Sequence, residues 1–517
     1  MERDEIIRIF LQFNYNIGAE TLEYIKNQNI SEKELKALLK SQTLIEPVIS
    51  VNILKEGIRG KSAKKLGTPS ASEVENRVHI REKSPLQETV RKPVEKLQYS
   101  IDLDIPYKLS QEPKITVFRN LFLDRYQSLS RILLENLEPE TTVLKYNLQL
   151  EEIPHQRAGI LIGMIHDTQV LHTNRFVIQL EDHLSGHLTK CVIVKESPSF
   201  PEYRRILRDS VIGVSGVLPK NFHEGHLTAF WGKDIIRPSF RAHHFAISEP
   251  STKVLCLSDI HIGSKRFSNR LFSRLVAYLN EKVNIPDFPF SAEKISSIII
   301  AGDLVEGTGV VTKEDSKLSI DSFEVQYEQL TKLLNEIPER ITIFTIPGEH
   351  DASQLAIPQP AIDKKIGKSL YSLPNVKNHG NPLRLTINGM KFLIFHAQSC
   401  ENSFHRLLKI EQTSLINGFK ELLEYRHLSP EYGSFAAYAP YSKDYLVINE
   451  MPDVLVTGHF HQAGKEIYKG VRIATCGTFK NPHKTTEKTY ALTSVGVFPV
   501  IDTGTGEITM IDLKQIP

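Results

Sequence analysis

Cysteine is scarce in this chain, and its few cysteines form no metal-binding pattern. Four cysteines stand far apart in the sequence, and none belongs to a C-x-x-C pair: Cys191, Cys256, Cys400 and Cys476. Disulfide scaffolds and cysteine-based zinc modules need closely spaced or paired cysteines. We therefore expect a protein of a reducing compartment, in which the cysteines fill small spaces in the core.

Long apolar runs and an excess of one charge are also missing. No stretch approaches the roughly 18 apolar residues of a membrane helix, and the opening Met1–Glu5 does not resemble a signal peptide. Lysine and arginine total 63 and aspartate and glutamate 61, so net charge alone indicates no nucleic-acid partner. We expect a cytoplasmic protein that does not contact a membrane.

At 517 residues the chain has room for about three domains. Residues 1–45 carry apolar positions at helical spacing, which predicts a small helical module suited to docking. Residues 46–110 are rich in charge. Between Leu54 and Gln98, eleven lysines or arginines stand against six glutamates, which predicts a flexible basic linker. Such a linker is either a solvated tether or a weak electrostatic contact for nucleic acid.

The pattern changes from helical to alternating between residues 111 and 248. Residues 114–136 place apolar side chains on one face and predict a connecting helix within 111–140. Five strand-like runs follow, at residues 158–164, 175–180, 190–194, 211–217 and 227–231. They predict an OB-fold β-barrel over 141–248. Phe176, Phe230 and Trp231 could bind single strands or belong to the core of a docking barrel, and the lack of clustered lysine and arginine favours the core.

Residues 249–517 alternate strands with helical segments, as in an α/β layered domain. Five strand-like runs in this region each end in ionisable residues. In chain order these are Asp259 and His261, then Asp303, then Glu349 and His350, then His396, and finally His459 and His461. One polar strand end is weak evidence, but five are hard to assign to packing because buried ionisable groups need partners. In open α/β sheets, ligands gather at the carboxyl ends of the strands.

This set of residue types suits a pair of bridged cations. Mixed histidine and carboxylate ligation favours Mn, Fe or Zn over Ca or Mg. Asp303 is the candidate bridging ligand, and Gly302 lets the backbone turn closely beneath it. Two such cations activate a bound water and stabilise charge on a phosphoryl oxygen. The alternative is a set of ligands that serves only as a structural scaffold.

The ordered motifs Asp-x-His, Gly-Asp-x-x-Glu, Gly-x-His-Asp, a lone strand-end His and Gly-His-x-His resemble those of the calcineurin-like binuclear metallophosphoesterases. Within that superfamily, residues 257–265, 346–361, 426–433 and 456–459 resemble the small subunits of archaeal D-family DNA polymerases. The resemblance covers about residues 115–517. It implies a multidomain α/β protein in which a calcineurin-like four-layer α/β/β/α phosphoesterase domain, residues 249–517, accompanies the OB-fold barrel and the N-terminal helical module.

The resemblance also implies an activity. The implied activity is that of a 3′→5′ DNA exonuclease, which proofreads the single-stranded 3′ end of a primer. The implied partner is a large polymerase subunit, and the sliding clamp is a further candidate partner. Two divalent ions are implied, Mn first and Fe or Zn as alternatives. One ion takes Asp259, His261, Asp303 and His461, and the other takes Asp303, Glu349, His396 and His459. His350 is the implied catalytic residue, which stabilises phosphoryl oxygens or protonates the leaving 3′-oxygen.

Two positions depart from the family pattern. Glu349 stands where the family has Asn, which raises the ligand charge of the protein from two negatives to three. We expect tighter cation binding and a less acidic metal, or alternatively a weakened second site in a subunit that only stabilises its large partner. Residues 478–484 lack the expected Trp- and Gln-rich pattern, which affects substrate or partner contacts. A free-standing phosphatase or small-molecule phosphodiesterase is disfavoured because it has little use for the barrel.

Overall fold

The computed structural model describes residues 16–17, 48–49, 97–107, 114–144, 158–171, 175–183, 186–217, 229–245, 251–285, 288–308, 318–401, 403–404, 414–433, 437–482 and 493–516. The chain divides into two compact units, Met1–Val90 and Arg91–Pro517. In the first unit, strands β1 (Asn16–Ile17) and β2 (Val48–Ile49) pair in parallel. The predicted helices of residues 1–45 and most of the predicted linker lie outside the described residues.

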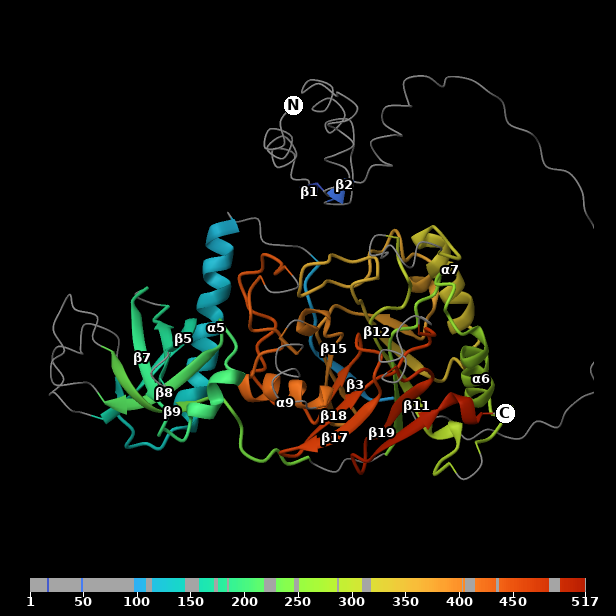
Figure 1. Ribbon diagram of the computed structural model, residues 1–517. Coiled ribbons are helices and arrows are strands. Elements are labelled where there is room, and N and C mark those ends of the chain that lie inside the picture. The colour runs from blue at the N-terminus through green and yellow to red at the C-terminus, as the bar shows by residue number, and fades with distance from the viewer. Residues whose placement is uncertain are drawn as a thin grey trace, which may run out of the picture. The chain divides into compact units, whose positions relative to one another are not determined.

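The second unit contains a long helix beside a small barrel (Figure 1). The elements are α5 (Lys114–Asn136), β4 (Val143–Leu144), β5 (Ala158–Leu171), β6 (Arg175–Glu181), β7 (Leu188–Val194), β8 (Val211–Val217) and β9 (Phe230–Ile236). Helix α5 has the bounds that the apolar spacing predicts. The strand order is β4-β5-β6-β7-β9-β8, and β8 also pairs with β5, so that five strands close into a barrel. A short 3₁₀ helix, Phe200–Arg205, connects β7 and β8.

The aromatic residues of the barrel divide between its core and its surface. Phe176 and Phe230 are fully buried in the barrel core, whereas Trp231 is 38% exposed. The Arg175 guanidinium lies 5.3 Å from the centre of the Trp231 ring. Neighbouring residues of a strand face opposite sides, so Phe230 and Trp231 cannot share one surface. The two phenylalanines are therefore core residues.

Two six-stranded sheets follow. The first has the order β13-β12-β11-β10-β19-β20. Its strands are β10 (Lys253–Leu257), β11 (Ile295–Ala301), β12 (Thr342–Ile346), β13 (Val376–Asn378), β19 (Val497–Asp502) and β20 (Ile508–Asp512). Strands β10 to β13 run parallel, with Leu257 opposite Ile300 and Ala301 opposite Ile346. Three carboxyl ends therefore meet at one edge of this sheet.

The second sheet has the order β17-β18-β16-β15-β14-β3. Its strands are β3 (Tyr99–Leu103), β14 (Leu383–Ile387), β15 (Met390–Phe395), β16 (Val454–Thr457), β17 (Gly464–Tyr468) and β18 (Val471–Thr475). Strand β3 pairs with β14, which corrects the linker prediction for residues 99–103. The low aromatic content of the surrounding segment concealed this strand, whose partner lies far along the chain. Phe395 lies opposite Thr457 in parallel strands, so the loops after β15 and β16 emerge together.

The two sheets pack face to face, and helices cover their outer sides. Helices α6 (Asn269–Leu279) and α7 (Phe323–Leu334) share a core with the first sheet, and α9 (Leu415–Tyr425) shares one with the second (Figure 1). On β15, Phe392 and Ile394 enter the core between the sheets, while Leu393 and Phe395 enter the core beneath α9. This alternation follows from the strand period of two residues. The other 3₁₀ helices among the described residues are Ala292–Lys294, Leu370–Ser372, Gln398–Cys400 and Leu513–Gln515.

The four cysteines are free and buried, as their sequence distribution predicts. Among the residues that the structure describes, no helix combines the length and the apolar character that crossing a membrane requires.

Candidate metal centre

Five of the predicted ligands stand on left-handed backbone. The φ angles are 54° at Asp259, 57° at His261, 53° at Asp303, 68° at His459 and 55° at His461. Positive φ is uncommon for residues other than glycine and persists only where the surrounding structure holds it. The amides of Asp259 and His261 donate to carbonyls of the neighbouring loop, those of Gly302 and Asp303, at 3.0 and 3.1 Å. The loops after β10 and β11 thus hold each other in this conformation.

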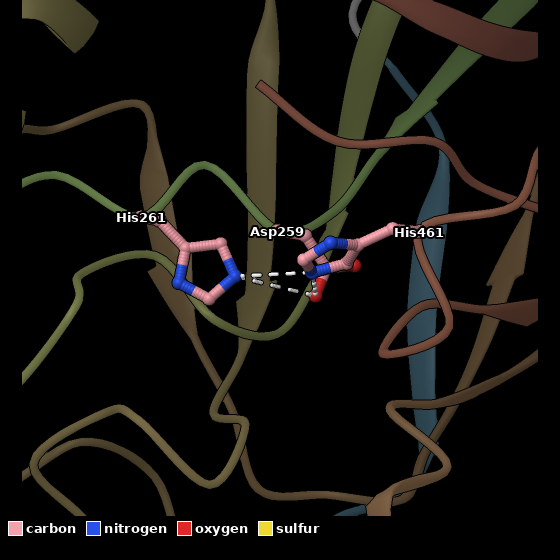
Figure 2. Close-up of side chains that lie close together, drawn as sticks. All are labelled: Asp259, His261 and His461. Atoms are coloured by element: carbon pink, nitrogen blue, oxygen red, sulfur yellow. Dashed lines mark hydrogen bonds and ion pairs between the residues drawn. The ribbon is translucent and has the colours of Figure 1, made fainter. Parts of the chain in front are cut away.

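The first ligand group comprises Asp259, His261 and His461. The Nε2 atoms of the two histidines lie 3.2 Å apart. His461 Nε2 lies 3.2 Å from Asp259 Oδ1, and His261 Nε2 lies 3.8 Å from the same oxygen. Figure 2 shows both imidazole rings directed toward the aspartate carboxylate. These three residues come from the loops after β10 and β16, and one ligand atom from each lies within 4.8 Å of the others.

The second ligand group comprises Glu349, His396 and His459. Glu349 Oε2 lies 2.7 Å from His396 Nε2, and Glu349 Oε1 lies 2.7 Å from His459 Nδ1. The Nδ1 atom of His396 faces the carbonyl of Ala301 at 2.7 Å, which leaves Nε2 for the site. The longer side chain at position 349 therefore reaches into the centre instead of turning away from it.

Asp303 lies between the two groups. Its Oδ2 is 3.7 Å from His261 Nε2 in the first group, and its Oδ1 is 3.4 Å from His396 Nε2 in the second. Gly348 permits this arrangement, because an added Cβ there would overlap Asp303 Oδ1 and lie 2.6 Å from His396 Nε2. The predicted bridging carboxylate therefore has one oxygen facing each group.

Several buried atoms at the centre have no hydrogen-bonding partner among the described residues. They include Asp259 Oδ1, Glu349 Oε2 and His396 Nε2, of which the last two lie 2.7 Å apart but not in hydrogen-bond geometry. Such atoms are costly to bury unless something else satisfies them. Their lone pairs converge between carboxylates and imidazoles, the donor set that transition-metal ions prefer. The residues present therefore fit divalent metal ions.

The electrostatics of the centre also favour added positive charge. Burial raises the pKa of both Asp259 and Glu349. Nearby histidines together lower it by more, chiefly His461 for Asp259 and His459 for Glu349. Both carboxyl pKa values therefore lie below their usual range. Conversely, burial lowers the pKa of His459, but the Glu349 carboxylate raises it to about 10. Without a metal, the histidines must supply the cationic charge that these buried carboxylates require.

His350 stands at the edge of the centre. Its Nδ1 lies 2.8 Å from the carbonyl of Glu306, so Nδ1 carries the proton that this contact needs. Its Nε2 lies 3.9 Å from Asp303 Oδ2, and its amide donates to Asp303 Oδ1 at 3.0 Å. The ring therefore presents Nε2 to the centre. All eight predicted site residues are brought together here.

Three further residues support the centre and were not assigned a role from the sequence. Asp351 accepts hydrogen bonds from the amides of Gly348 and Leu304 at 2.9 and 3.1 Å, which ties the loops after β11 and β12 together. Burial, followed by the charge of Asp303, raises the pKa of Asp351 to about 7. Glu306 and Lys480 form a buried pair at 2.6 Å behind His261. Asp351 and Glu306 occur in the recognised motifs, whereas Lys480 had no sequence signal.

The chain is similar in sequence to known subunits of DNA polymerases. The family model for the B subunits of DNA polymerases alpha and epsilon matches residues 254–465. The DNA polymerase II small subunit of Methanothermobacter thermautotrophicus is 32% identical over 386 residues, which cover 74% of this chain and 77% of the relative. That of Archaeoglobus fulgidus is 30% identical over 476 residues, or 92% of this chain and 91% of the relative. A solved structure of an archaeal phosphodiesterase aligns with 50% of this chain at 13% identity and a TM-score of 0.26.

The extent of these matches goes beyond the metal centre. The match to the Archaeoglobus relative extends over 92% of this chain and 91% of the relative. The identity is high enough over enough of both chains to establish common ancestry. The chain belongs to the family of archaeal DNA polymerase II small subunits.

Proposed function

We propose that this centre binds two divalent metal ions and hydrolyses DNA phosphodiesters. One ion would be held by Asp259, His261, Asp303 and His461. The other would be held by Asp303, Glu349, His396 and His459. The observation that carries the proposal is Asp303, whose two oxygens face the two ligand groups separately. Mn is the first candidate, and Fe and Zn are alternatives.

The ions, when bound, would lower the pKa of a water molecule and neutralise charge on the phosphoryl group. The chain's own residues contribute orientation and proton transfer. His350 is the proposed catalytic residue, because its Nδ1 is engaged by the carbonyl of Glu306 and its Nε2 faces the centre. A proton held at Nε2 can pass to the leaving 3′-oxygen or hydrogen-bond to the phosphoryl oxygens.

The family suggests the substrate and the partner. A small subunit of a DNA polymerase implies a large catalytic subunit, and a phosphodiesterase attached to a polymerase suits proofreading. We therefore propose a 3′→5′ exonuclease that acts on the single-stranded 3′ end of a primer within a two-subunit polymerase. The sliding clamp is a further candidate partner.

The barrel and the N-terminal segment are proposed as accessory domains. The closed order β5-β6-β7-β9-β8, with a short helix between the third and fourth strands of the barrel, supports an OB-fold at residues 141–248. Residues 1–45 are proposed as a helical docking module, and residues 249–517 as a calcineurin-like phosphoesterase domain.

One observation keeps a second function in view. Both oxygens of Glu349 contact histidines at 2.7 Å, so this carboxylate can neutralise the second ligand group without a metal. A chain that relied on this ion pairing would be a scaffold for the large subunit rather than a nuclease. The contact between Glu349 Oε2 and His396 Nε2 lacks hydrogen-bond geometry, so it does not satisfy either buried atom, which favours the metal-binding alternative.

An exonuclease assay separates the two functions. The small subunit in complex with its large subunit is given mismatched primer-template DNA and Mn²⁺, and released nucleotides are measured. We expect activity in the unaltered complex, its retention in Glu349→Asn, and a loss of about 10²- to 10⁴-fold in His350→Ala. His379→Ala is the matched control, because His379 also forms a 2.7 Å ion pair, with Asp104, but outside the centre. Activity in Glu349→Asn but none in the unaltered complex would establish the scaffold.

A further inference from the structure

The segment after β18 packs directly behind the first ligand group. Thr478 Oγ1 and the Phe479 amide both donate to the carbonyl of Asp259, at 2.8 and 3.0 Å. The Lys480 amide in turn donates to Thr478 Oγ1 at 2.9 Å. This segment, which departs from the pattern of the family, therefore holds the β10 loop and carries a lysine into the interior.

Lys480 ends a chain of buried contacts that leads to a proposed ligand. Its side chain is 7% exposed, and its Nζ lies 2.6 Å from Glu306 Oε1. The other carboxylate oxygen, Glu306 Oε2, lies 2.9 Å from His261 Nδ1. Neither Oε2 nor Nδ1 makes a hydrogen bond among the described residues, so their 2.9 Å approach is an ion-pair contact. The Glu306 carboxylate thus connects the ammonium to the ring of His261.

The contact at Nδ1 decides where the other nitrogen of His261 points. The Nε2 atom lies 3.8 Å from Asp259 Oδ1 and 3.7 Å from Asp303 Oδ2, which are both proposed ligand atoms. An imidazole held at one nitrogen has its second nitrogen fixed in direction, because the ring is rigid. Metal-binding histidines commonly contact a carboxylate in this way.

Without Lys480, the Glu306 carboxylate could bind a cation. Together with His261 and His350 it forms a group whose ligand atoms could hold a cation of their own. The buried ammonium of Lys480 supplies that cationic charge from within the chain, since a buried carboxylate needs a partner of opposite charge. Glu306 then remains directed at His261 instead of acting as a ligand itself.

We infer that Lys480 is a positioning residue for the first metal ion: it fixes Glu306 against Nδ1 of His261 and so directs Nε2 of His261 toward the ion. This inference rests on the proposed metal centre. It assigns a role to a residue of the segment that had no explanation in the sequence.

Metal affinity, rather than nuclease activity, tests this role. Mn²⁺ is titrated into the metal-free full-length chain, and binding is followed by calorimetry and by the electron paramagnetic resonance signal of free Mn²⁺. We expect Lys480→Met and Glu306→Gln each to weaken one of the two sites by about 10- to 100-fold, the usual effect of removing a partner of a ligating histidine. Lys469→Met is the matched control, because Lys469 also forms a 2.6 Å ion pair, with Glu424, but is 36% exposed and outside the centre.

The double variant Lys480→Met/Glu306→Gln distinguishes positioning from a general loss of structure. If Lys480 acts through Glu306, the double variant binds no more weakly than Glu306→Gln alone, because the two effects are not additive. The double variant also removes both buried charges, so it provides the measurement if Lys480→Met alone fails to fold. If the double variant loses affinity by the product of the two single losses, the inference is wrong.

The remaining outcomes separate this inference from the proposed function. If the unaltered chain binds no Mn²⁺, the metal centre itself is wrong and the role of Lys480 falls with it. If the unaltered chain binds two ions and Lys480→Met binds both with unchanged affinity, the metal centre stands and only the inference is wrong.

Discussion

Two buried clusters in this protein both contain aspartate and histidine but differ in how their charges are satisfied. One is the metal centre. The other, the Arg125 cluster, consists of Arg125 on α5 with Asp444 and His427, and all three are fully buried or nearly so. In the metal centre several ligand atoms have no hydrogen-bonding partner among the described residues. In the Arg125 cluster the charged and polar groups meet partners within the chain.

The groups of the Arg125 cluster contact one another and neighbouring backbone carbonyls. Arg125 Nε donates to Asp444 Oδ2 at 2.7 Å, and its Nη1 donates to the carbonyls of Pro430 and Asp209 at 2.8 and 3.1 Å. Asp444 Oδ2 also lies 2.9 Å from His427 Nε2. These contacts join α5, the loop before β8 of the barrel, and the segment between α9 and β16. The cluster therefore attaches the barrel to the layered sheets.

This difference shows that burial of charge does not by itself mark a functional site. Both clusters contain a buried aspartate whose pKa lies below its usual range. For Asp444, burial raises the pKa and Arg125 outweighs it. For Asp259, burial raises the pKa and His461 outweighs it. What distinguishes the metal centre is a set of ligand atoms that form no hydrogen bond with any described residue.

The largest expected effect comes from removing the charge of the bridging carboxylate. We expect Asp303→Asn to lower the exonuclease rate by at least about 10³-fold, because metal ions supply several kcal/mol of transition-state stabilisation. Asparagine keeps an oxygen for the amide of His350, which donates to Asp303 Oδ1, so the thermal midpoint of the metal-free protein should change little. A rate close to that of the unaltered complex would remove Asp303 from the centre.

Breaking the Arg125 cluster should mainly lower the stability of the protein. Arg125→Met leaves the Asp444 carboxylate buried without its main partner, and the loss of one partner of a buried pair costs about 3–5 kcal/mol. Chemical denaturation of the metal-free chain measures this loss. The exposed pair of Arg131 and Glu135, both 60% exposed, is the matched control, and Arg131→Met should have almost no effect. Equal stability of the two variants would show that the Arg125 cluster does not hold the domains together.

The smallest effect is a dependence of stability on pH. His427 Nδ1 accepts from the Ser429 amide at 3.1 Å, so the neutral ring carries its proton at Nε2, toward Asp444. Burial, followed by the charge of Arg125, lowers the pKa of His427 to about 4. As the pH falls, His427 is protonated in the unfolded chain from about pH 6.5 but in the folded chain only near pH 4. The free energy of unfolding therefore decreases between these two pH values, by up to about 3 kcal/mol.

Denaturation of the metal-free chain between pH 7 and pH 4 measures this dependence. His427→Gln should flatten the part of the curve that belongs to this residue, because glutamine does not titrate. His379, which faces Asp104 at a more exposed position, provides the control substitution His379→Gln. An unchanged curve for His427→Gln would show that His427 is not held neutral in the folded protein.

Much of the metal centre could be predicted from the sequence because its ligands are local features. Each strand ends in a short motif, and the strand period with the parallel arrangement places those ends at common edges. Asp259, Asp303 and His396 were therefore identified without a structure, and the structure brings them together. The bounds of α5 were also predictable, because its apolar spacing repeats over 23 residues.

Contacts between distant segments could not be predicted in this way. Arg125 and Asp444 are 319 residues apart, Glu306 and Lys480 are 174 residues apart, and neither pair belongs to a repeating pattern. Strand β3 was missed because it has only five residues and follows directly on the charge-rich linker, while its partner β14 lies far along the chain. A single lysine or arginine in a sequence has many possible neighbours.

The sequence by itself therefore determined which residues are candidate metal ligands, since motif, residue type and strand period are encoded locally. The tertiary structure alone decided which charges are left for a ligand and which are neutralised within the chain. The physical reason is that the cost of burying a charge depends on every group that packs around it. Those groups, Lys480 behind His261 and Arg125 beside Asp444, arrive from distant parts of the chain only when it folds.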